Sequence, residues 1–320
     1  MPRFFPSLTA ALAWGAMFPI AAGALDRIDP FHLTAFRYLV ATAIFVALLV
    51  AIEGRDALRP DGRTLELFLL GTLGFAGFNL LTYVALEHTR PQDAALIVAT
   101  APAVTVVATW LVSSVRPRGV QLLLTALALL GVALVISRGN PADLAGGGVG
   151  AWELLVLGGV VAWVAYTLGA RRFPGFSPLR YTTLTAVGGT LTIVAITQGL
   201  TWAGELTAPG GNDLVANWWR LLYVVGPAAV IAVLAWNDGI RRIGPPNGAL
   251  FMNLVPVVRF AIAVAQGYRP GAVELAGAGL TVAALVAANL AGRRPARGPA
   301  QVGTRASGAG WPANAAKSRA

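Results

Sequence analysis

Ten long apolar runs follow one another along the chain, separated by short polar breaks. They cover residues 4–25, 31–52, 65–86, 92–114, 119–137, 150–169, 179–200, 218–237, 246–267 and 272–291. A helix needs about 20 consecutive apolar residues to cross the hydrocarbon core of a bilayer. Only 12% of the residues are charged, whereas soluble domains have about 25%. The sequence therefore predicts an all-α integral membrane protein with ten transmembrane helices.

The second half of the sequence repeats the first at an offset of 154 residues. Three ungapped matches share this offset: Pro91 with Pro245, Ala95-Leu96 with Ala249-Leu250, and Pro102-Ala103-Val104 with Pro256-Val257-Val258. Because five is odd, two five-helix units in tandem must have opposite orientations in the membrane. We expect a first repeat over residues 1–140 and a second, inverted repeat over 141–292. Residues 293–320 are predicted to be a disordered, basic tail, because they are too poor in apolar side chains to order themselves.

The distribution of basic residues predicts the orientation. With the amino terminus placed in the cytoplasm, 17 of the 24 basic residues fall on the cytoplasmic side and five outside, and Arg37 and Arg259 lie within spans. Cytoplasmic loops of membrane proteins carry an excess of Lys and Arg. We therefore expect a multi-pass protein of a bacterial-type inner (plasma) membrane with both termini, and the tail, in the cytoplasm.

Composition and spacing exclude several function classes. The chain has no cysteine, which removes disulfides, thiolate catalysis and cysteine-based metal or redox sites. Its two histidines, His32 and His88, lie at span ends, and the sequence has no catalytic-serine motif, phosphate loop or metal-ligand spacing. We predict no enzyme activity, no cofactor and no metal site. The expected partners are a small-molecule substrate and the lipid bilayer, with no nucleic acid and no obligate protein partner.

The paired motifs Ala94-Ala95-Leu96, running to Pro102, and Gly248-Ala249-Leu250, running to Pro256, give the chain a family resemblance. Over residues 5–292 it resembles the drug/metabolite transporter superfamily, in the ten-helix branch with two EamA-like domains. Two further motifs, Trp163-Val164-Ala165-Tyr166 and Ala235-Trp236-Asn237, are similar to the YddG-type exporters of aromatic and other amino acids. The resemblance implies an exporter of amino acids.

In transporters built from inverted repeats, the substrate binds near the bilayer midplane, at the interface between the repeats. The candidate substrate-binding residues are polar or aromatic residues within spans: Trp14, Phe18, Asn79, Tyr83, Trp163, Tyr166, Asn237, Phe251, Asn253 and Arg259. Trp14 and Trp163 hold matching positions in the two repeats, and we expect them to face each other across a pore. The alternative is that they pack toward lipid or the interfacial belt.

Two prolines and two arginines within spans have open interpretations. Pro102 and Pro256 remove backbone hydrogen bonds and are candidate hinges for alternating access, or fixed kinks that shape the bundle. Arg37 is near enough to the start of its span to extend to the headgroups. Arg259 lies deeper, where it contacts either a substrate carboxylate or a helix-end carbonyl.

No Asp or Glu is clearly at mid-membrane in the sequence, and the first span lacks the membrane-embedded Glu of the related four-helix proton antiporters. We therefore predict an uncoupled facilitator. Two alternatives are proton-coupled multidrug or metabolite efflux, and sugar-phosphate or nucleotide-sugar exchange. Exchange would need several pore-facing Lys or Arg residues for the phosphates, and Arg259 is the one residue that the sequence offers. A membrane receptor or scaffold is the alternative outside transport.

Overall fold

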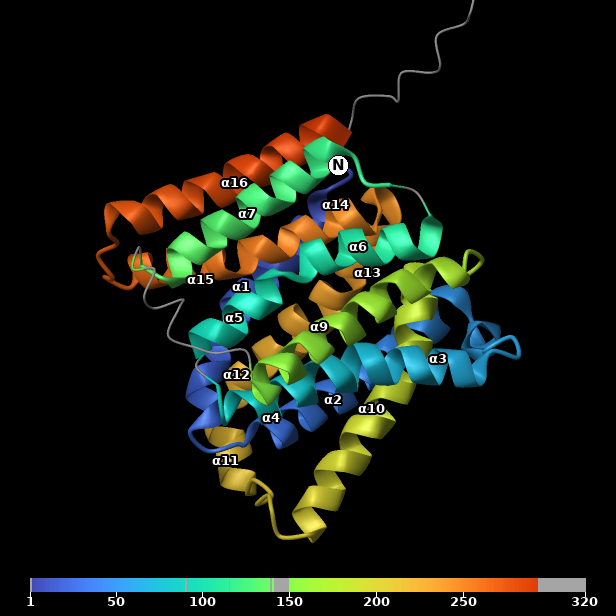
Figure 1. Ribbon diagram of the computed structural model, residues 1–320. Helices are drawn as coiled ribbons and strands as arrows, with labels where there is room; N and C mark the ends of the chain where they lie inside the picture. The colour runs from blue at the N-terminus through green and yellow to red at the C-terminus, as the bar shows by residue number, and fades with distance from the viewer. Residues whose placement is uncertain (1, 90, 115, 139, 141–149, 293–320) are drawn as a thin grey trace, which may run out of the picture.

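The computed structural model describes residues 2–89, 91–114, 116–138, 140 and 150–292, which form a helical bundle (Figure 1). Nine helical segments among these residues are long and apolar enough to cross a membrane. A tenth apolar helix, α16 (Ala272–Gly292), is shorter by the same measure. The prediction of an all-α membrane protein with ten spans is confirmed. The predicted tail, 293–320, lies outside the described residues.

The first repeat contains α1 (Phe5–Leu25), α2 (Pro30–Glu53), a third span of α3 (Thr64–Gly71), η2 (Thr72–Gly77) and α4 (Phe78–Leu86), a fourth of α5 (Pro91–Ala99) and α6 (Ala101–Ser113), and α7 (Gly119–Ile136). The second contains α9 (Ala151–Gly169), α10 (Pro178–Trp202), an eighth span of α12 (Trp218–Val225), η4 (Gly226–Ile231) and α13 (Ala232–Ile243), a ninth of α14 (Pro245–Ala249), η5 (Leu250–Asn253) and α15 (Leu254–Ala265), and α16. Short helices η1 (Arg55–Leu58), η3 (Ala170–Arg172) and α11 (Gly211–Ala216) lie in connections.

The eighth span is the one whose end differs most from the sequence prediction. It continues to Ile243, although the predicted run ends at residue 237. Asp238 and Arg242 follow that point, and they pair across one helical turn, Oδ2 to NH2 2.7 Å. The pair supports the helix while it passes from the apolar layer to water.

The third span of each repeat contains a π-helical segment, and the two segments occupy matching positions. η2 begins at Thr72 and η4 at Gly226, the same 154-residue separation that joins Pro91 to Pro245. A π segment widens the helix and changes which carbonyls are bonded within it, and such segments are frequent at functional sites. The matching discontinuities are the structural counterpart of the sequence repeat.

Both fourth spans are interrupted as well. α5 and α6 are separated at Thr100, and the 3₁₀ segment η5 separates α14 from α15. Pro102 and Pro256 lie just after these interruptions. Proline has no N–H and clashes with the carbonyl four residues earlier, which explains a break at this point in each repeat.

The repeats are interlocked rather than side by side (Figure 1). α1 packs on α13 and α15 of the second repeat, and α9 packs on η2, α4, α5 and α6 of the first. α7 and α16, the last helices of the two repeats, form a pair. Glycine makes the closest approaches possible, because a Cβ on Gly71 would overlap the carbonyl of Thr185, and one on Gly131 would overlap Gly277.

The bundle has two ends, which we call the terminal end and the opposite end. The amino terminus and the last turn of α16 lie together at the terminal end (Figure 1), as an even number of spans requires. The loop after α6 and the loop after α9 lie there too. α11 and the starts of α2 and α12 lie at the opposite end.

Candidate functional site

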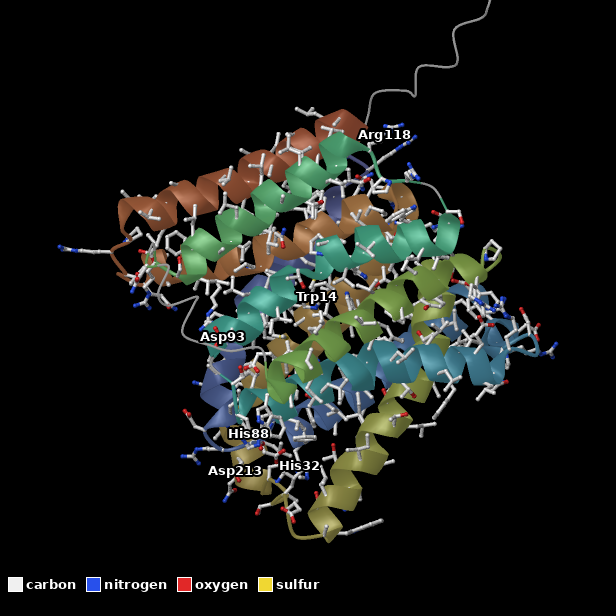
Figure 2. All side chains as sticks on the ribbon, viewed as in Figure 1. Trp14, His32, His88, Asp93, Arg118 and Asp213 are labelled. Atoms are coloured by element: carbon white, nitrogen blue, oxygen red, sulfur yellow. The ribbon has the colours of Figure 1, made fainter. Side chains whose placement is uncertain are left out.

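Three tryptophans from three helices meet in the interior of the bundle. The ring centroids are 5.7 Å apart for Trp14 and Trp163, 5.5 Å for Trp14 and Trp236, and 5.8 Å for Trp163 and Trp236. The helices concerned are α1, α9 and α13, so the cluster lies where the repeats meet. Figure 2 shows Trp14 between Arg118 at the terminal end and His32 and Asp213 toward the opposite end. The prediction from the sequence paired Trp14 with Trp163. It did not include Trp236 among the site residues, although Trp236 directly precedes Asn237.

The indole N–H groups of the three rings differ in their hydrogen-bond partners. Trp14 Nε1 donates to the carbonyl of Ala228 (2.9 Å), which lies within the π segment η4. Trp236 Nε1 donates to Thr167 Oγ1 (3.3 Å). Trp163 Nε1 is buried and has no partner among the described residues. Burial of an unpaired donor costs about 1–3 kcal/mol, so this position favours a ligand that supplies an acceptor.

Asn237 connects the cluster to a buried polar network. Its amide nitrogen donates to the hydroxyls of Tyr166 and Thr182, both at 2.7 Å. Tyr166 stacks on Tyr181 at 5.3 Å between centroids, and the Tyr181 hydroxyl donates to the Tyr166 carbonyl (2.6 Å). The Asn237 Oδ1 atom has no partner among the described residues. The network therefore fixes the orientation of the amide and leaves one free acceptor.

Arg37 is the buried cation of the bundle interior, with 6% of its surface exposed. Its NH2 atom donates to Asn79 Oδ1 (2.8 Å), and its guanidinium lies 4.4 Å from the centre of the Tyr38 ring. Asn79 in turn donates to the carbonyl of Phe75 in η2 (2.7 Å). The prediction that Arg37 extends to the headgroups is wrong, because its guanidinium is buried and donates to Asn79 of the third span and to Met17 Sδ of the first (3.2 Å). No ion pair of Arg37 occurs among the described residues.

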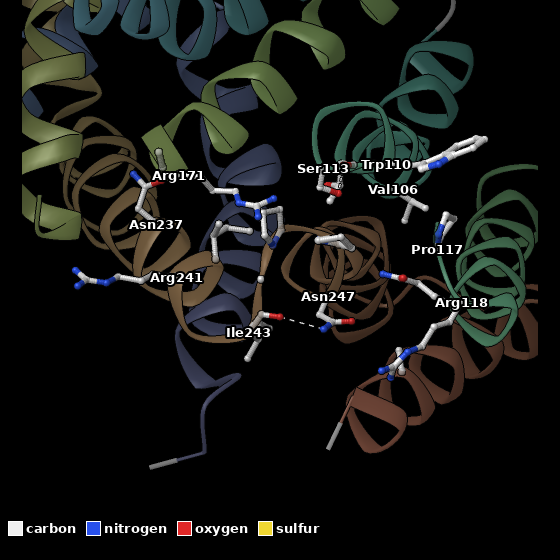
Figure 3. Close-up of a pocket in the computed structure, with 18 of the residues that line it drawn as sticks. Val106, Trp110, Ser113, Pro117, Arg118, Arg171, Asn237, Arg241, Ile243 and Asn247 are labelled. Carbon is white, nitrogen blue, oxygen red and sulfur yellow. Dashed lines mark hydrogen bonds between the residues drawn. The ribbon is translucent and has the colours of Figure 1, made fainter. Parts of the chain in front are cut away.

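A cavity of about 850 Å³ opens at the terminal end and reaches Tyr181 and Asn237. Both residues are almost fully buried. Four arginines also line the cavity: Arg116, Arg118, Arg171 and Arg241. In Figure 3, Asn237 and Arg171 lie on one side of this pocket and Arg118 lies on the other. In the sequence, these arginines predict the orientation of the chain. They come from three separate parts of the chain, so their common pocket is visible in three dimensions alone.

The other candidate residues lie around the central cluster or away from it. Tyr83 is half-buried, with its ring centre 6.5 Å from that of Phe31. Phe251 is buried and stacks on Phe4 (6.2 Å). Asn253 is buried at the η5 interruption, and neither polar atom of its amide has a partner among the described residues.

Two candidates are exposed on the bundle rather than gathered at the tryptophans. Phe18 has 47% of its surface exposed. Arg259 is exposed on α15 and forms no ion pair within the described part of the chain. Neither lines the cavity that reaches Asn237. The arginines of the cavity mouth, unlike Arg259, share a cavity with Asn237.

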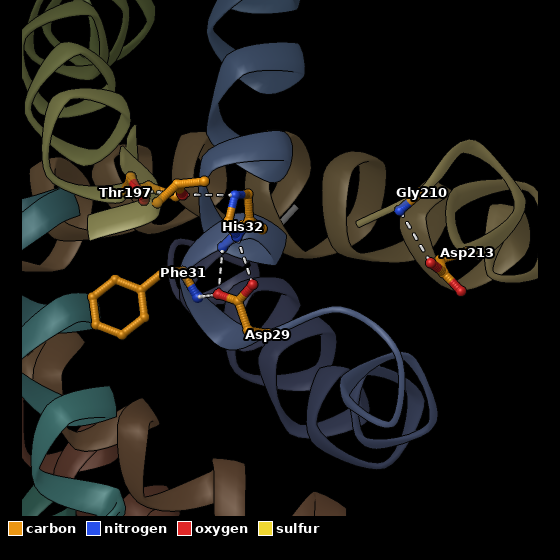
Figure 4. A network of polar contacts seen from close by, with 7 residues as sticks. Asp29, Phe31, His32, Thr197, Gly210 and Asp213 are labelled. Carbon is orange, nitrogen blue, oxygen red and sulfur yellow. Dashed lines mark hydrogen bonds and ion pairs between the residues drawn. The ribbon is translucent and has the colours of Figure 1, made fainter. Parts of the chain in front are cut away.

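The opposite end is held by polar contacts between helices and loops. Asp29 caps α2 by accepting from the backbone N–H groups of Phe31 and His32 (2.9 and 3.0 Å), and it also contacts the His32 ring at 2.5 Å. Figure 4 shows Asp29 beside Phe31 and the His32 ring at the start of α2. The other ring nitrogen of His32 lies 3.2 Å from Thr201 Oγ1 on α10. Arg27 reaches Asp213 of α11 at 3.6 Å. These contacts connect α2 to α10 and the start of α2 to α11.

The chain is similar to known transporters over nearly its whole length. Residues 5–137 and 150–290 match the EamA-like transporter family. The chain belongs to this family. It is a multi-pass membrane transporter with the family's two repeats.

Three similar proteins illustrate the range of this family. The uncharacterized transporter YrdR of Bacillus subtilis is 32% identical, over 90% of this chain and 91% of that protein. A probable terminal-alkyne amino-acid exporter of Streptantibioticus cattleyicolor is 26% identical, over 90% of this chain and 94% of that protein. A crystal structure with 22% identity has a TM-score of 0.73 and covers 91% of this chain and 99% of the other. The last match supports the fold.

Proposed function

We propose that the protein exports amino acids, aromatic and other neutral ones, or related small metabolites, by alternating access and without ion coupling. The membrane is the bacterial inner membrane, with both termini in the cytoplasm. The observation that carries the proposal is the cavity from the terminal end to Asn237. The three tryptophans do not line this cavity, but Trp236, one of the three, directly precedes Asn237 in α13. Its volume of about 850 Å³ is within the usual range of small-molecule sites. Cargo enters it from the cytoplasm.

Two unpaired groups beside Tyr166 suit the ends of an amino acid. Asn237 Oδ1 is an acceptor for an ammonium group, and Trp163 Nε1 is a donor for a carboxylate. Tyr166 contacts both residues, through its hydroxyl to Asn237 and through its ring to Trp163 (5.3 Å). Neither contact uses a fixed charge, which keeps binding weak enough for release. The similarity to a probable terminal-alkyne amino-acid exporter agrees with this chemistry.

Alternating access follows from the inverted repeats. A cavity that is open at one end of such a bundle becomes open at the other when one repeat rocks against its partner. The interruptions near Pro102 and Pro256 leave few backbone hydrogen bonds to resist bending. We assign the hinges to these two positions.

The absence of coupling rests on the places of the carboxylates. Asp238 directly follows Asn237, but it pairs with Arg242 and does not line the cavity that reaches Asn237. No Asp or Glu is among the described residues that line this cavity. Without a carboxylate at the cargo, a proton has no obvious place to bind. Sugar-phosphate or nucleotide-sugar exchange is a second candidate function, because four arginines line the cavity mouth.

Counterflow in proteoliposomes tests the proposal. Vesicles loaded with unlabelled phenylalanine, leucine or alanine should accumulate the labelled amino acid, with or without a pH gradient. Trp163→Ala should abolish the uptake, whereas Trp202→Ala should not, since Trp202 is exposed at the opposite end. Uptake that stops when the pH gradient is removed would contradict the uncoupled mechanism. Equal activity of the two variants would contradict the site.

A further inference from the structure

We infer that the cavity at the terminal end is an anion-selective entrance, which admits cargo through a carboxylate or phosphate group and rejects organic cations. The inference rests on the proposed function and adds the chemical class of cargo to it. The residues that carry it are Arg116, Arg118, Arg171 and Arg241, which we call the arginine rim.

The rim collects positive charge from three separate parts of the chain. Two of its members lie in the connection between α6 and α7, Arg171 lies after α9, and Arg241 lies near the end of α13. No Asp or Glu is among the described residues that line the cavity with them. None of the four forms an ion pair within the described chain, and the one hydrogen bond found is from Arg241 NH1 to the Phe176 carbonyl (3.4 Å).

Most of the other described arginines at the same end differ from the rim. Five that do not line the cavity each contact a carboxylate: Arg63 and Arg172 contact Glu66, Arg59 contacts Asp56, Arg180 contacts Asp61, and Arg242 contacts Asp238. Arg3 and Arg55 form no ion pair within the described part of the chain. The positive-inside rule explains an excess of arginine on one side of a membrane. It does not explain why all four arginines at the cavity lack acidic partners while most of their neighbours have them. This segregation leaves the charge of the rim available to a ligand.

Physical chemistry then gives the class of the ligand. A cleft with walls of low dielectric constant and charges of one sign focuses the field and raises the local concentration of the opposite ion. Guanidinium groups bind carboxylates and phosphates through paired hydrogen bonds. Deeper in the same cavity, Asn237 is 5% exposed and has a free acceptor, Oδ1. Cargo with an anionic group near the rim and a donor near Asn237 satisfies both.

The first experiment does not depend on the cargo. The chain has no cysteine, so Thr109→Cys, which lines the cavity, provides a single reporter, with Ala203→Cys at the exposed opposite end as control. The probes are a negatively charged and a positively charged methanethiosulfonate of similar size. We expect the anion-to-cation rate ratio at position 109 to exceed that at position 203 by about tenfold or more.

Neutralising the rim should remove this preference. Arg171→Gln with Arg241→Gln should lower the ratio at position 109 several-fold, and added salt should do the same by screening. Arg55→Gln is the matched control, because Arg55 is exposed at the same end and does not line the cavity. Equal ratios at positions 109 and 203, or equal effects of all three substitutions, would overturn the inference.

The second experiment compares three forms of one cargo in proteoliposomes: phenylalanine, N-acetylphenylalanine and phenylalanine amide. The first two carry a carboxylate and should be transported, whereas the cationic amide should not. The rim variants should raise KM for the carboxylates and leave the maximal rate unchanged. Transport of the amide at the rate of phenylalanine would overturn the inference. A rim effect seen only with phosphatidylglycerol in the vesicles would overturn it too, in favour of a lipid headgroup site.

The two proposals fail in different ways. If no form of phenylalanine is transported and the reagent ratio at position 109 is high, the amino-acid assignment is wrong, and phosphate esters become the cargo to which the rim applies. If phenylalanine is transported and the anion-to-cation rate ratio is the same at positions 109 and 203, the amino-acid assignment stands and the anion-selective entrance is wrong.

Discussion

The two ends of the bundle differ, although the two repeats are related by inversion. The terminal end has an open cavity whose four arginines lack acidic partners among the described residues. At the opposite end, Asp29, His32 and Thr201 connect α2 to α10, and Arg27 reaches Asp213. In an inverted repeat, helix ends that lie on one side of the membrane in the first half correspond to helix ends on the other side in the second half. Under the proposed alternating access, the difference belongs to one conformation of the cycle, in which the terminal end is open.

Matching arginines of the two repeats show the same difference in detail. The dipeptide Arg37-Tyr38 of the second span occurs again as Arg180-Tyr181 in the seventh span, at an offset of 143 rather than 154 residues. Arg37 is buried and bonded to Asn79, whereas Arg180 contacts Asp61 and the carbonyl of Ala57 in the loop after α2. One arginine therefore ties the interior of the first repeat, and the other ties a loop at the open end.

The largest expected effect is a difference in accessibility between the ends. Thr109→Cys lines the open cavity, and Thr197→Cys lies on α10 toward the opposite end, where Thr197 is 3% exposed. A minor conformation is populated at about 0.1–10%, so a small neutral thiol reagent should react roughly 10- to 1,000-fold more slowly at position 197 than at 109. Timed labelling followed by mass spectrometry gives the two rates. Similar rates would show that the opposite end is open as well, and would remove the difference between the ends.

The sequence predicted the architecture well, because hydropathy, proline spacing and loop charge are each local signals. From their matched positions we expected Trp14 and Trp163 to face each other across a pore; the rings are in edge contact, 5.7 Å apart, and neither lines the cavity. The sequence could not locate Arg37, since the depth of a side chain depends on acceptors such as Asn79, 42 residues away. The arginine rim was hidden for the same reason. Its members are distant in sequence, and each is explained individually by membrane orientation.

The next largest effect should come from Asn237, the buried amide of the open cavity. Asn237→Leu removes the donor to Tyr166 and Thr182 and fills the free acceptor site. We expect transport to fall at least about tenfold and stability to fall by about 1–3 kcal/mol, the cost of leaving buried polar groups without their partner. Proteoliposome flux and thermal unfolding in detergent measure the two quantities.

A matched control lies in the same cavity. Asn247→Leu changes an amide that lines the mouth and bonds to the carbonyl of Ile243 (3.0 Å). This variant should keep most of the transport activity. If both leucine variants lose activity equally, the site is the cavity as a whole rather than its inner end.

A smaller effect is expected at Arg37, which lies in the first half of α2, the helix that starts at the opposite end. Arg37→Gln retains a donor for Asn79 but removes the charge and its contact with the Tyr38 ring. If this cation stabilises the closed conformation, the labelling rate at Thr197→Cys should rise several-fold while the rate at Thr109→Cys is unchanged. Arg180→Gln changes the matched arginine and should leave the rate at position 197 unaltered. The same response to both substitutions would argue against a specific role for Arg37.

The smallest effect should come from Asp29, whose carboxylate both caps α2 and contacts His32. Loss of an N-cap costs about 1 kcal/mol, so Asp29→Ala should raise the labelling rate at Thr197→Cys roughly fivefold if the cap stabilises the closed end. Asp29→Asn retains a capping side chain and removes the charge, so it separates the two contributions. A rate near that of the unsubstituted chain assigns the effect to the cap, and a rate near that of the alanine variant assigns it to the charged contact with His32. An equal increase in labelling rate at positions 109 and 197 would mean that the whole bundle is less stable. Asp29 would then have no specific role in closing the opposite end.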